Sequence, residues 1–169
     1  HLGNGRIFGV DVSYLTEDSP LGTAGALGLM PPPQDTLLVN NGDVLTKVNL
    51  NSFLSYHHEE SANLTMAVVG QDIQVPYGVI ECHGTFVRHL TEKPVLNFLV
   101  NAGIYLLEPN VHHFIPKGKK LDMPDLIQRL LDQNRTVASF PIREDWIDIG
   151  QHADYEKAQE VVKHWDRQP

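Results

Sequence analysis

Short apolar runs typical of strands alternate along this chain with segments in which apolar residues recur at helical spacing. The alternation of Val10, Val12 and Tyr14 with polar neighbours predicts a strand over 7–15. Further strands are expected over 36–40, 65–69, 99–107 and 136–142, with a hairpin of 79–81 and 86–90 flanking Cys82-His83-Gly84.

The helical segments carry recognisable start signals. Asn49 is expected to cap a helix, and Asp122 another with Pro124 in its first turn. A short helix is expected in 22–30 and a last one after Gly150. The apolar stripes predicted for the last two long helices are Leu126, Ile127, Leu130 and Leu131, and Tyr155, Ala158, Val161, Val162 and Trp165. Strands interleaved with helices predict an α/β sheet covered on both faces.

Composition excludes several classes of protein. The chain has 169 residues and a net charge of −8, without a Lys/Arg stripe, which argues against nucleic acid binding. No apolar run approaches the ~18 residues of a membrane span. Cys82 is the single cysteine, so no internal disulfide framework is expected, and a cytoplasmic location is predicted. The first residues do not resemble a signal peptide, and the first methionine is Met30, so we expect a chain that starts inside a gene product.

Two aspartates follow strand-like segments, where ligands bind in open α/β sheets. Asp43 follows the run 36–40, and Asp148 lies between the strand 136–142 and the last helix. Taken alone, a common Gly-Asp turn accounts for Asp43 and a helix cap for Asp148.

Other polar residues have both an ordinary and a functional interpretation. Lys93 is most simply a solvated turn residue, and Pro76-Tyr77-Gly78 a plain strand entry. Asn101 interrupts an apolar strand, so it either serves the fold or faces a ligand. The pairs His57-His58 and His112-His113 are expected to be surface or core histidines, because adjacent residues on a helix point in different directions.

Seven segments carry more weight together than separately. In chain order they are Pro20-Leu21-Gly22-Thr23-Ala24-Gly25-Ala26-Leu27, Asn41-Gly42-Asp43, Val75-Pro76-Tyr77-Gly78-Val79, Glu92-Lys93-Pro94, Asn101-Ala102-Gly103-Ile104-Tyr105, Asp122-Met123-Pro124-Asp125-Leu126 and Trp146-Ile147-Asp148-Ile149-Gly150.

This series resembles the sugar-1-phosphate nucleotidyltransferase family, which includes mannose-1-phosphate guanylyltransferases and glucose-1-phosphate thymidylyltransferases. It looks closest to a bacterial branch often fused to CBS domains and serving surface polysaccharides such as lipopolysaccharide. The resemblance implies a three-layer α/β/α Rossmann-like domain with a mixed sheet, in which residues 1–169 form the C-terminal two-thirds. The family's glycine-rich triphosphate loop and first strands have no counterpart here. We therefore expect a fragment that is inactive alone and self-associates through an exposed strand edge, giving a homo-oligomer.

The resemblance also implies residue roles. Gly22, Thr23, Ala24 and Gly25 would line the nucleobase pocket, and Asp43 and Asp148 would hold Mg²⁺. The sugar-side roles fall to Tyr77 and Gly78, which would border the ring, to Glu92 and Asn101, which would bond hydroxyls, and to Lys93, which would contact the phosphate.

These residue types suit transfer of a nucleotidyl group from an NTP to a sugar 1-phosphate. The attacking phosphate monoester has a second pKa near ~6 and is already anionic at neutral pH, so no general base is needed. The obstacle is repulsion between anions, which Mg²⁺ and a lysine reduce. Mg²⁺ takes one or two carboxylates and keeps waters and substrate phosphates, as two aspartates would allow. The proline after Lys93 is expected to keep its backbone extended.

Two other functions stay open at this point. A catalytically silent relative could bind a nucleotide sugar and regulate a partner, although Asp43, Lys93 and Asp148 are all present. A glycosyltransferase with a related fold would show an Asp-x-Asp metal motif, whereas this chain has Asn41-Gly42-Asp43. The resemblance favours guanine as the base.

Overall fold

The computed structural model describes residues 2–150 and 152–165. Its strands are β1 (Leu37–Asn40), β2 (Val44–Thr46), β3 (Leu64–Gln74), β4 (Val79–His83), β5 (Phe86–Thr91), β6 (Val95–Leu107), β7 (Val137–Pro141) and β8 (Trp146–Asp148). Its helices are α1 (Gly22–Gly25), α2 (Leu50–Glu59), α3 (Met123–Asp132) and α4 (His152–Trp165), with 3₁₀ turns η1 (Arg6–Phe8), η2 (Ala26–Leu29) and η3 (Pro109–Phe114).

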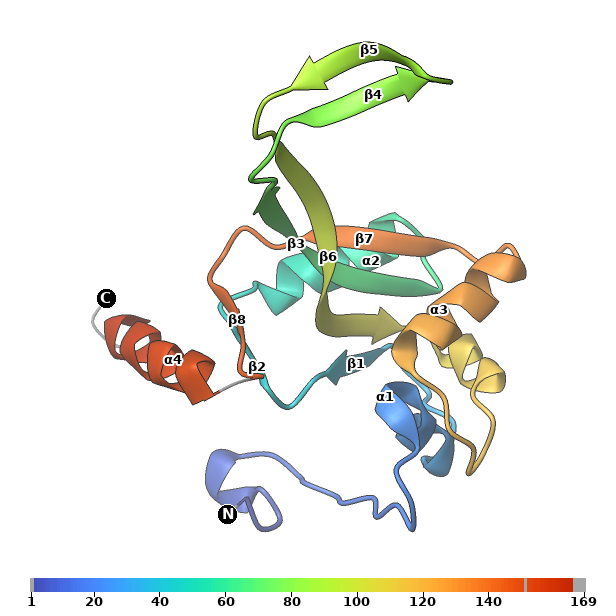
Figure 1. Ribbon diagram of the computed structural model, residues 1–169. Helices are drawn as coiled ribbons and strands as arrows, with labels where there is room; N and C mark the ends of the chain where they lie inside the picture. The colour runs from blue at the N-terminus through green and yellow to red at the C-terminus, as the bar shows by residue number, and fades with distance from the viewer. Residues whose placement is uncertain (1, 151, 166–169) are drawn as a thin grey trace.

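The central sheet has the order β1-β6-β3-β7 and is mixed (Figure 1). β6 pairs antiparallel with β1 and β3, whereas β7 lies parallel to β3. The connection from β3 to β7 includes α3, as parallel neighbours require a long crossover. The predicted mixed sheet is confirmed.

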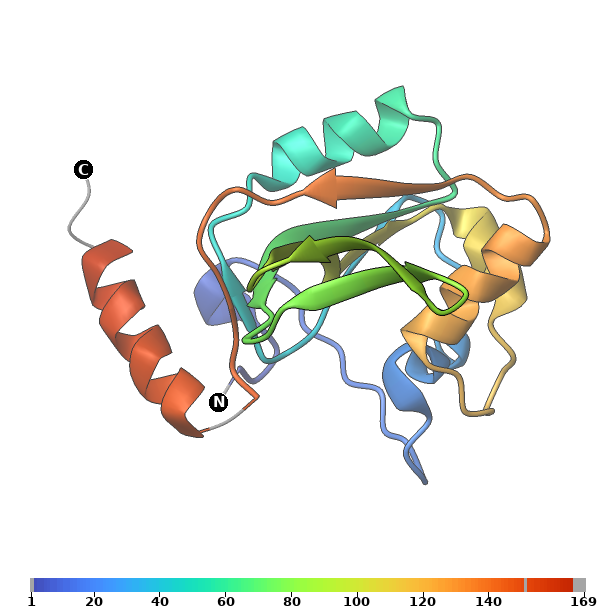
Figure 2. The ribbon, with the colours of Figure 1, turned by 45° about the horizontal axis from the view of Figure 1, so that its top comes forward.

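Alternating residues of β6 face opposite sides of this sheet. Ile104 and Leu106 pack with Phe53 of α2, whereas Tyr105 and Leu107 pack with the cluster that includes Leu126 of α3. Figure 2 shows α2 lying along one face of the sheet, with α3 and α1 at its other side. Both faces are covered, so the predicted three-layer α/β/α architecture is confirmed.

Two helix starts occur where capping residues predicted them. The Asn49 side chain accepts a hydrogen bond from the Ser52 amide at 3.0 Å, which closes the first turn of α2. Asp122 is the N-cap of α3, but its carboxylate accepts from the Thr23 amide instead of capping its own helix. The starts of these two helices could be predicted from the sequence because the capping residues act locally.

The apolar faces of two helices differ from the prediction. In α3, Leu131 is exposed and Met123 is buried in its place, because α3 turns its first residue toward α1 and η3. In α4, Ala158 is buried, while Tyr155 is half-exposed, because this helix stands beside β2 and β8 and not over the sheet.

The strand predicted over 7–15 is wrong. These residues hold η1 and then irregular backbone, with Val10 and Tyr14 exposed. Alternation suits one face of a sheet, but a strand also needs a hydrogen-bonding neighbour strand, and the Val12 amide donates instead to the Asn4 carbonyl of the same irregular segment.

The predicted hairpin is confirmed as β4 and β5, which project from the long strands β3 and β6 (Figure 1). Because β3 and β6 stay paired with each other beyond the ends of β1 and β7, both are longer than their central apolar runs suggested. We call residues 75–94 the arm. None of the helices within 2–150 and 152–165 combines the length and apolar character needed to cross a membrane.

Candidate functional site

A short ribbon beside the main sheet brings Asp43 and Asp148 together. In it, β2 pairs antiparallel with β8, so that Val44 lies opposite Asp148. The Ile149 amide donates to the Asp43 carbonyl at 2.9 Å. Both aspartates are exposed, and the two motifs that contain them become neighbours although they are far apart in the sequence.

The donor set at this ribbon fits a magnesium ion. Two exposed carboxylates supply the oxygen ligands that Mg²⁺ prefers, and the ion ordinarily completes its shell with water and phosphate oxygens. In the described part of the chain, no three His, Cys, Asp or Glu residues gather as a larger ligand set.

A hollow of about 130 Å³ lies against this ribbon. Its lining joins three of the sequence motifs and consists of Asn41, Val44, Asn101, Ala102, Gly103, Tyr105, Trp146 and Asp148. The Asn41 amide donates to the Gly103 carbonyl at 2.9 Å, which holds the first two motifs together. Asn101 and Asp148, predicted for sugar and metal, thus border one space.

The close approach of Asn41 to β6 requires a glycine at position 103. Its φ is +75°, and a Cβ there would lie 2.8 Å from the side-chain nitrogen of Asn41. The register between β3 and β6 also shifts here, with residues 102–104 opposite Ala67. The bulge lets β6 turn the asparagine and the glycine of its motif toward the hollow.

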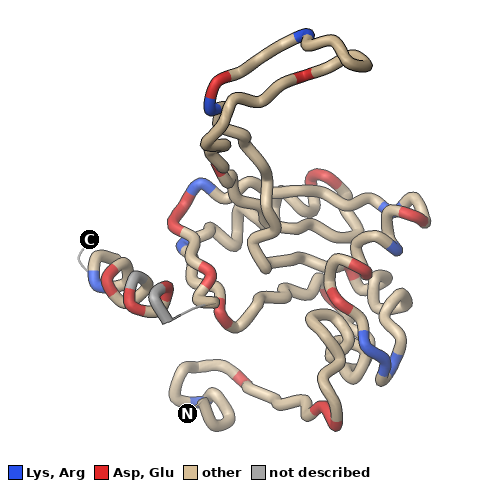
Figure 3. Tube along the Cα trace, in the orientation of Figure 1, with Lys and Arg blue, Asp and Glu red and all other residues tan. Residues whose placement is uncertain are grey.

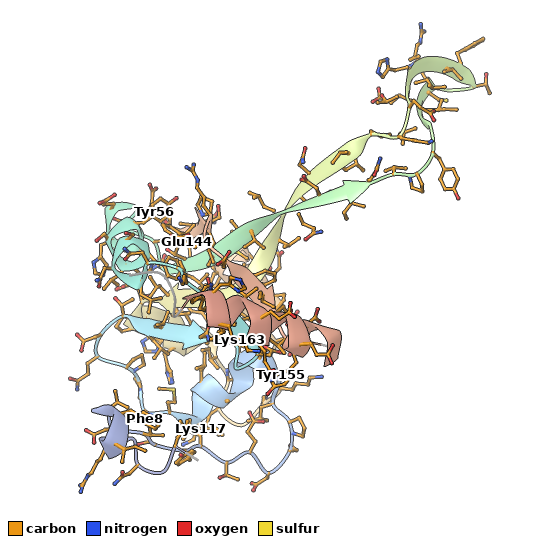
Figure 4. The ribbon with its side chains drawn as sticks, turned by 90° about the vertical axis from the view of Figure 1, so that its left-hand side faces the viewer. Phe8, Tyr56, Lys117, Glu144, Tyr155 and Lys163 are labelled. Carbon is orange, nitrogen blue, oxygen red and sulfur yellow. The ribbon has the colours of Figure 1, made fainter. Side chains whose placement is uncertain are left out.

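Trp146 separates the hollow from a larger cleft of about 430 Å³. Its indole nitrogen donates to the Ala102 carbonyl at 2.9 Å. The cleft is lined by Val69, Gly70, Gln71, Ile142, Glu144, Trp146, Ile147, Asp148 and Asp154. Figure 4 shows Glu144 above α4, on the side of the molecule that faces the viewer.

The sequence motifs did not single out Gln71 or Glu144. Gln71 lies on the extension of β3, and Glu144 in the loop before β8. Only the packing of β8 beside β3 and α4 places them around Asp148, so no local signal could have found them.

The Gly22–Gly25 segment forms one unit with the start of α3. Gly22 has a φ of +79°, and a Cβ there would lie 2.8 Å from the Leu121 carbonyl. The amides of Ala24 and Gly25 both donate to that carbonyl at 3.0 Å, and Thr23 Oγ1 accepts from the Met123 amide at 2.7 Å. Gly22 and Thr23 stay accessible at the surface, whereas Ala24 and Gly25 are buried, and none of them lines the hollow or the cleft.

The base of the arm gathers the four remaining predicted residues. The Lys93 amide donates to the Tyr77 carbonyl at 3.2 Å, and the Cα of Gly78 lies so close to Glu92 that a Cβ would be 3.0 Å from its carboxylate. Tyr77, Glu92 and Lys93 are exposed. The structure therefore forms a second group, on the arm, apart from the hollow that contains Asn101 (Figure 1).

The extended backbone expected at Lys93 is wrong, because its φ is +46°. Closing the base of the arm requires the hydrogen bond from Lys93 to Tyr77 and another from the Val75 amide to the Pro94 carbonyl at 3.0 Å. These two bonds hold Lys93 in the left-handed region despite the following proline.

Charge is dispersed over the molecule (Figure 3). Across the described residues, Lys and Arg lie on the arm, on α3 and α4 and in loops, including the loop before α3, interspersed with Asp and Glu, and form no continuous stripe. The densest basic group is Lys117, Lys119 and Lys120 in that loop.

Comparison with known proteins agrees with the fold and the converging motifs. Residues 1–164 match the nucleotidyl transferase family. The chain belongs to that family, as the resemblance of its motifs indicated.

Among its relatives are a UTP–glucose-1-phosphate uridylyltransferase of Synechocystis and a mannose-1-phosphate guanylyltransferase of Mycobacterium tuberculosis. They are 31 % and 29 % identical over 94 % and 91 % of this chain. The chain spans 46 % and 45 % of their own lengths, so it matches less than half of each.

Solved structures share the fold. A putative glucose-1-phosphate thymidylyltransferase from Bacillus anthracis, crystallised with sucrose, superposes with a TM-score of 0.71 at 23 % identity, over 95 % of this chain and 68 % of that one. HddC from Yersinia pseudotuberculosis, complexed with GMP-PN, gives a TM-score of 0.64 at 23 % identity, over 90 % and 67 %.

Proposed function

We propose that this chain is the C-terminal two-thirds of a nucleotidyltransferase domain that joins an NTP to a sugar 1-phosphate and releases pyrophosphate. The observation that carries the proposal is the meeting of Asn41-Gly42-Asp43, Asn101–Tyr105 and Trp146–Gly150 around one hollow. Family membership and the names of the relatives support it.

In this reaction a sugar phosphate oxygen attacks the α-phosphorus of the NTP, and the bond to the pyrophosphate leaving group breaks. Asp43 and Asp148 would hold Mg²⁺, which when bound neutralises phosphate charge. Lys93 would add a positive charge at the sugar phosphate. Since the attacking oxygen is already ionised, the residues only orient the two anions and reduce their repulsion.

The substrate-binding roles are also proposals. Gly22, Thr23, Ala24 and Gly25 would line the nucleobase pocket, with Thr23 contributing its accessible surface because its hydroxyl is bonded to α3. Tyr77, Gly78 and Glu92 would meet the sugar from the arm, and Asn101 from the hollow. Guanine is our choice of base, supported by the guanylyltransferases among the relatives.

The cellular setting follows from the same proposal. A supplier of surface polysaccharide precursors would work in the cytoplasm, and the exposed, unpaired Cys82 suits a reducing compartment. Self-association is proposed as well, because β1 is an edge strand of the central sheet.

The test is pyrophosphate release by the full-length protein from a panel of NTP and sugar 1-phosphate pairs, with Mg²⁺ and with EDTA. Metal-dependent turnover of one pair, best with GTP, is the expected result. Tight binding of a nucleotide sugar without turnover of any pair would favour the silent regulatory relative.

A further inference from the structure

Asn101 has both ends of its side-chain amide held by its own strand. Its Oδ1 accepts from the Gly103 amide at 3.0 Å, and its Nδ2 donates to the Tyr105 hydroxyl oxygen at 2.7 Å. A backbone N–H can only donate, so the amide oxygen must face Gly103 and the nitrogen must face Tyr105. The Tyr105 oxygen is therefore an acceptor in this contact.

The order of the motif makes this contact possible. Asn101 and Tyr105 lie on the same side of β6 across the bulge at 102–104, since the Asn101 amide reaches the Tyr105 hydroxyl. Gly103 lies between them in the chain, and a Cβ at this position would meet Asn41 and Val44. The glycine therefore lets the Asn41 motif approach Asn101 and Tyr105 at the hollow.

Tyr105 is rigidly placed. The residue is 3 % exposed, and its ring packs in the cluster with Leu107 and Leu126. Burial raises the pKa of its phenol, and the hydrogen bond from Asn101 opposes this only in part. The hydroxyl therefore keeps its proton at neutral pH, and this proton is not used by the bond from Asn101.

We propose that Tyr105 is a positioning residue for sugar 1-phosphate recognition, acting through Asn101. Its hydroxyl fixes the asparagine amide so that the second Nδ2 hydrogen is available in the hollow for an oxygen of the sugar or its phosphate. The inference rests on the proposed function for the identity of the ligand. The orientation of the amide itself rests only on the two hydrogen bonds.

The kinetic test is Tyr105→Phe in the full-length protein, which keeps the packed ring and removes the acceptor. The KM for sugar 1-phosphate should rise about fivefold to tenfold, while the KM for NTP and kcat stay within about twofold. Asn101→Ala should raise the same KM, and the double variant should be no worse than Asn101→Ala alone, because both changes remove one interaction. If the two substitutions raised the KM for sugar 1-phosphate additively, or if Tyr105→Phe changed the KM for NTP, the proposal would be overturned.

A matched control is Tyr56→Phe. The Tyr56 hydroxyl donates to the Ser139 carbonyl at 3.2 Å on the α2 side of the sheet, remote from the hollow, so its removal should leave both KM values unchanged (Figure 4).

A second measurement separates this inference from the proposed function. The side-chain amide protons of Asn101 are followed by ¹⁵N–¹H correlation spectra without substrate. In Tyr105→Phe they should shift and exchange with water faster, whereas in Tyr56→Phe they should not change. If no NTP and sugar 1-phosphate pair turns over, the proposed function fails while this result still stands. Unchanged Asn101 resonances in Tyr105→Phe would overturn the positioning role even in an active enzyme.

Discussion

At the scale of single residues, the carboxylates of Asp43 and Asp148 carry the proposed metal site. Asp43→Asn or Asp148→Asn in the full-length protein should lower kcat by roughly 10² or more, since each removes a charge that stabilises the transition state. Initial rates of pyrophosphate release at saturating Mg²⁺ measure the effect. Asp35→Asn, an exposed aspartate before β1, is the control and should be silent. Near wild-type turnover in either site variant would remove that residue from the metal site.

Lys93 tests the contribution of the arm. Lys93→Met should lower kcat/KM for sugar 1-phosphate by about tenfold or more, and Lys93→Arg by less, because arginine keeps the charge in a broader planar group. Steady-state kinetics with varied sugar 1-phosphate provide the measurement, and Lys117→Met provides the matched control on an exposed loop. Full activity of Lys93→Met would show that Lys93 is an ordinary turn residue.

A substitution at Gly103 tests how closely the Asn41 motif packs against the Asn101–Tyr105 motif. Gly103→Ala should lower the free energy of unfolding by about 1–3 kcal/mol, because the new methyl group would meet Asn41 and the backbone is left-handed. Gly42→Ala is the comparison, since nothing lies within 4 Å of its added Cβ. Urea denaturation of both variants gives the difference. Equal free energies of unfolding for the two variants would mean that Asn41, in the turn before β2, can move to accommodate the added methyl group.

At the scale of elements, a buried network joins α2, β3 and the ends of β1 and β6. His57 is 1 % exposed, and its ring nitrogens contact Thr65 Oγ1 at 2.6 Å and Glu108 Oε1 at 3.0 Å. Thr36 donates to the same glutamate oxygen at 2.7 Å. His57 is therefore a core histidine, one of the two kinds expected, and its two partners come from separate segments of the chain.

This network predicts a pH dependence of stability. Burial alone raises the pKa of Glu108, but hydrogen bonds from Thr36 and His57 and the charges of His57 and His58 outweigh it, so the pKa is lowered. The ionised Glu108 carboxylate therefore stabilises the folded protein. This contribution is complete above the ordinary carboxyl pKa of about 4.3, and it is lost as the pH falls through the lower pKa that Glu108 has in the folded protein.

Glu108→Gln should therefore lower the unfolding free energy at neutral pH by about 1 kcal/mol and flatten its fall in acid. Thermal unfolding between about pH 3 and 7 measures both effects. Glu59→Gln, an exposed change on the same helix as His57, should keep the wild-type slope. If the stability of Glu108→Gln fell with decreasing pH as steeply as that of the wild type, the Glu108 carboxylate would not be the group that controls this fall.

At the scale of the whole molecule, the sheet ends on one side at β1. Unpaired edge groups favour pairing with another chain, so sedimentation velocity should show a dimer or larger species at micromolar concentrations. Leu38→Lys, which places a charge on β1, should shift the distribution toward monomer, whereas Leu131→Lys on the exposed face of α3 should not. A monomer throughout would contradict the proposed self-association.

Local signals in the sequence were sufficient for much of the secondary structure. Asn49 and Asp122 mark helix starts by their residue types, and the apolar runs of β1, β6 and β7 have the length and composition of strands. The strand predicted at Val10–Tyr14 failed because alternation does not supply a pairing partner. Lys93 failed because two hydrogen bonds across the arm outweigh the preference set by its proline neighbour.

The sequence by itself determined which residue types are present for the proposed chemistry, namely two aspartates, a lysine, an asparagine and flanking glycines in family order. Only the tertiary structure decided which of them meet. The pairing of β2 with β8 joins Asp43 to Asp148, the bulge at Gly103 turns Asn101 toward them, and Tyr105 fixes its amide. These contacts depend on strand register and long-range packing, which bring together residues with no local relation in the chain.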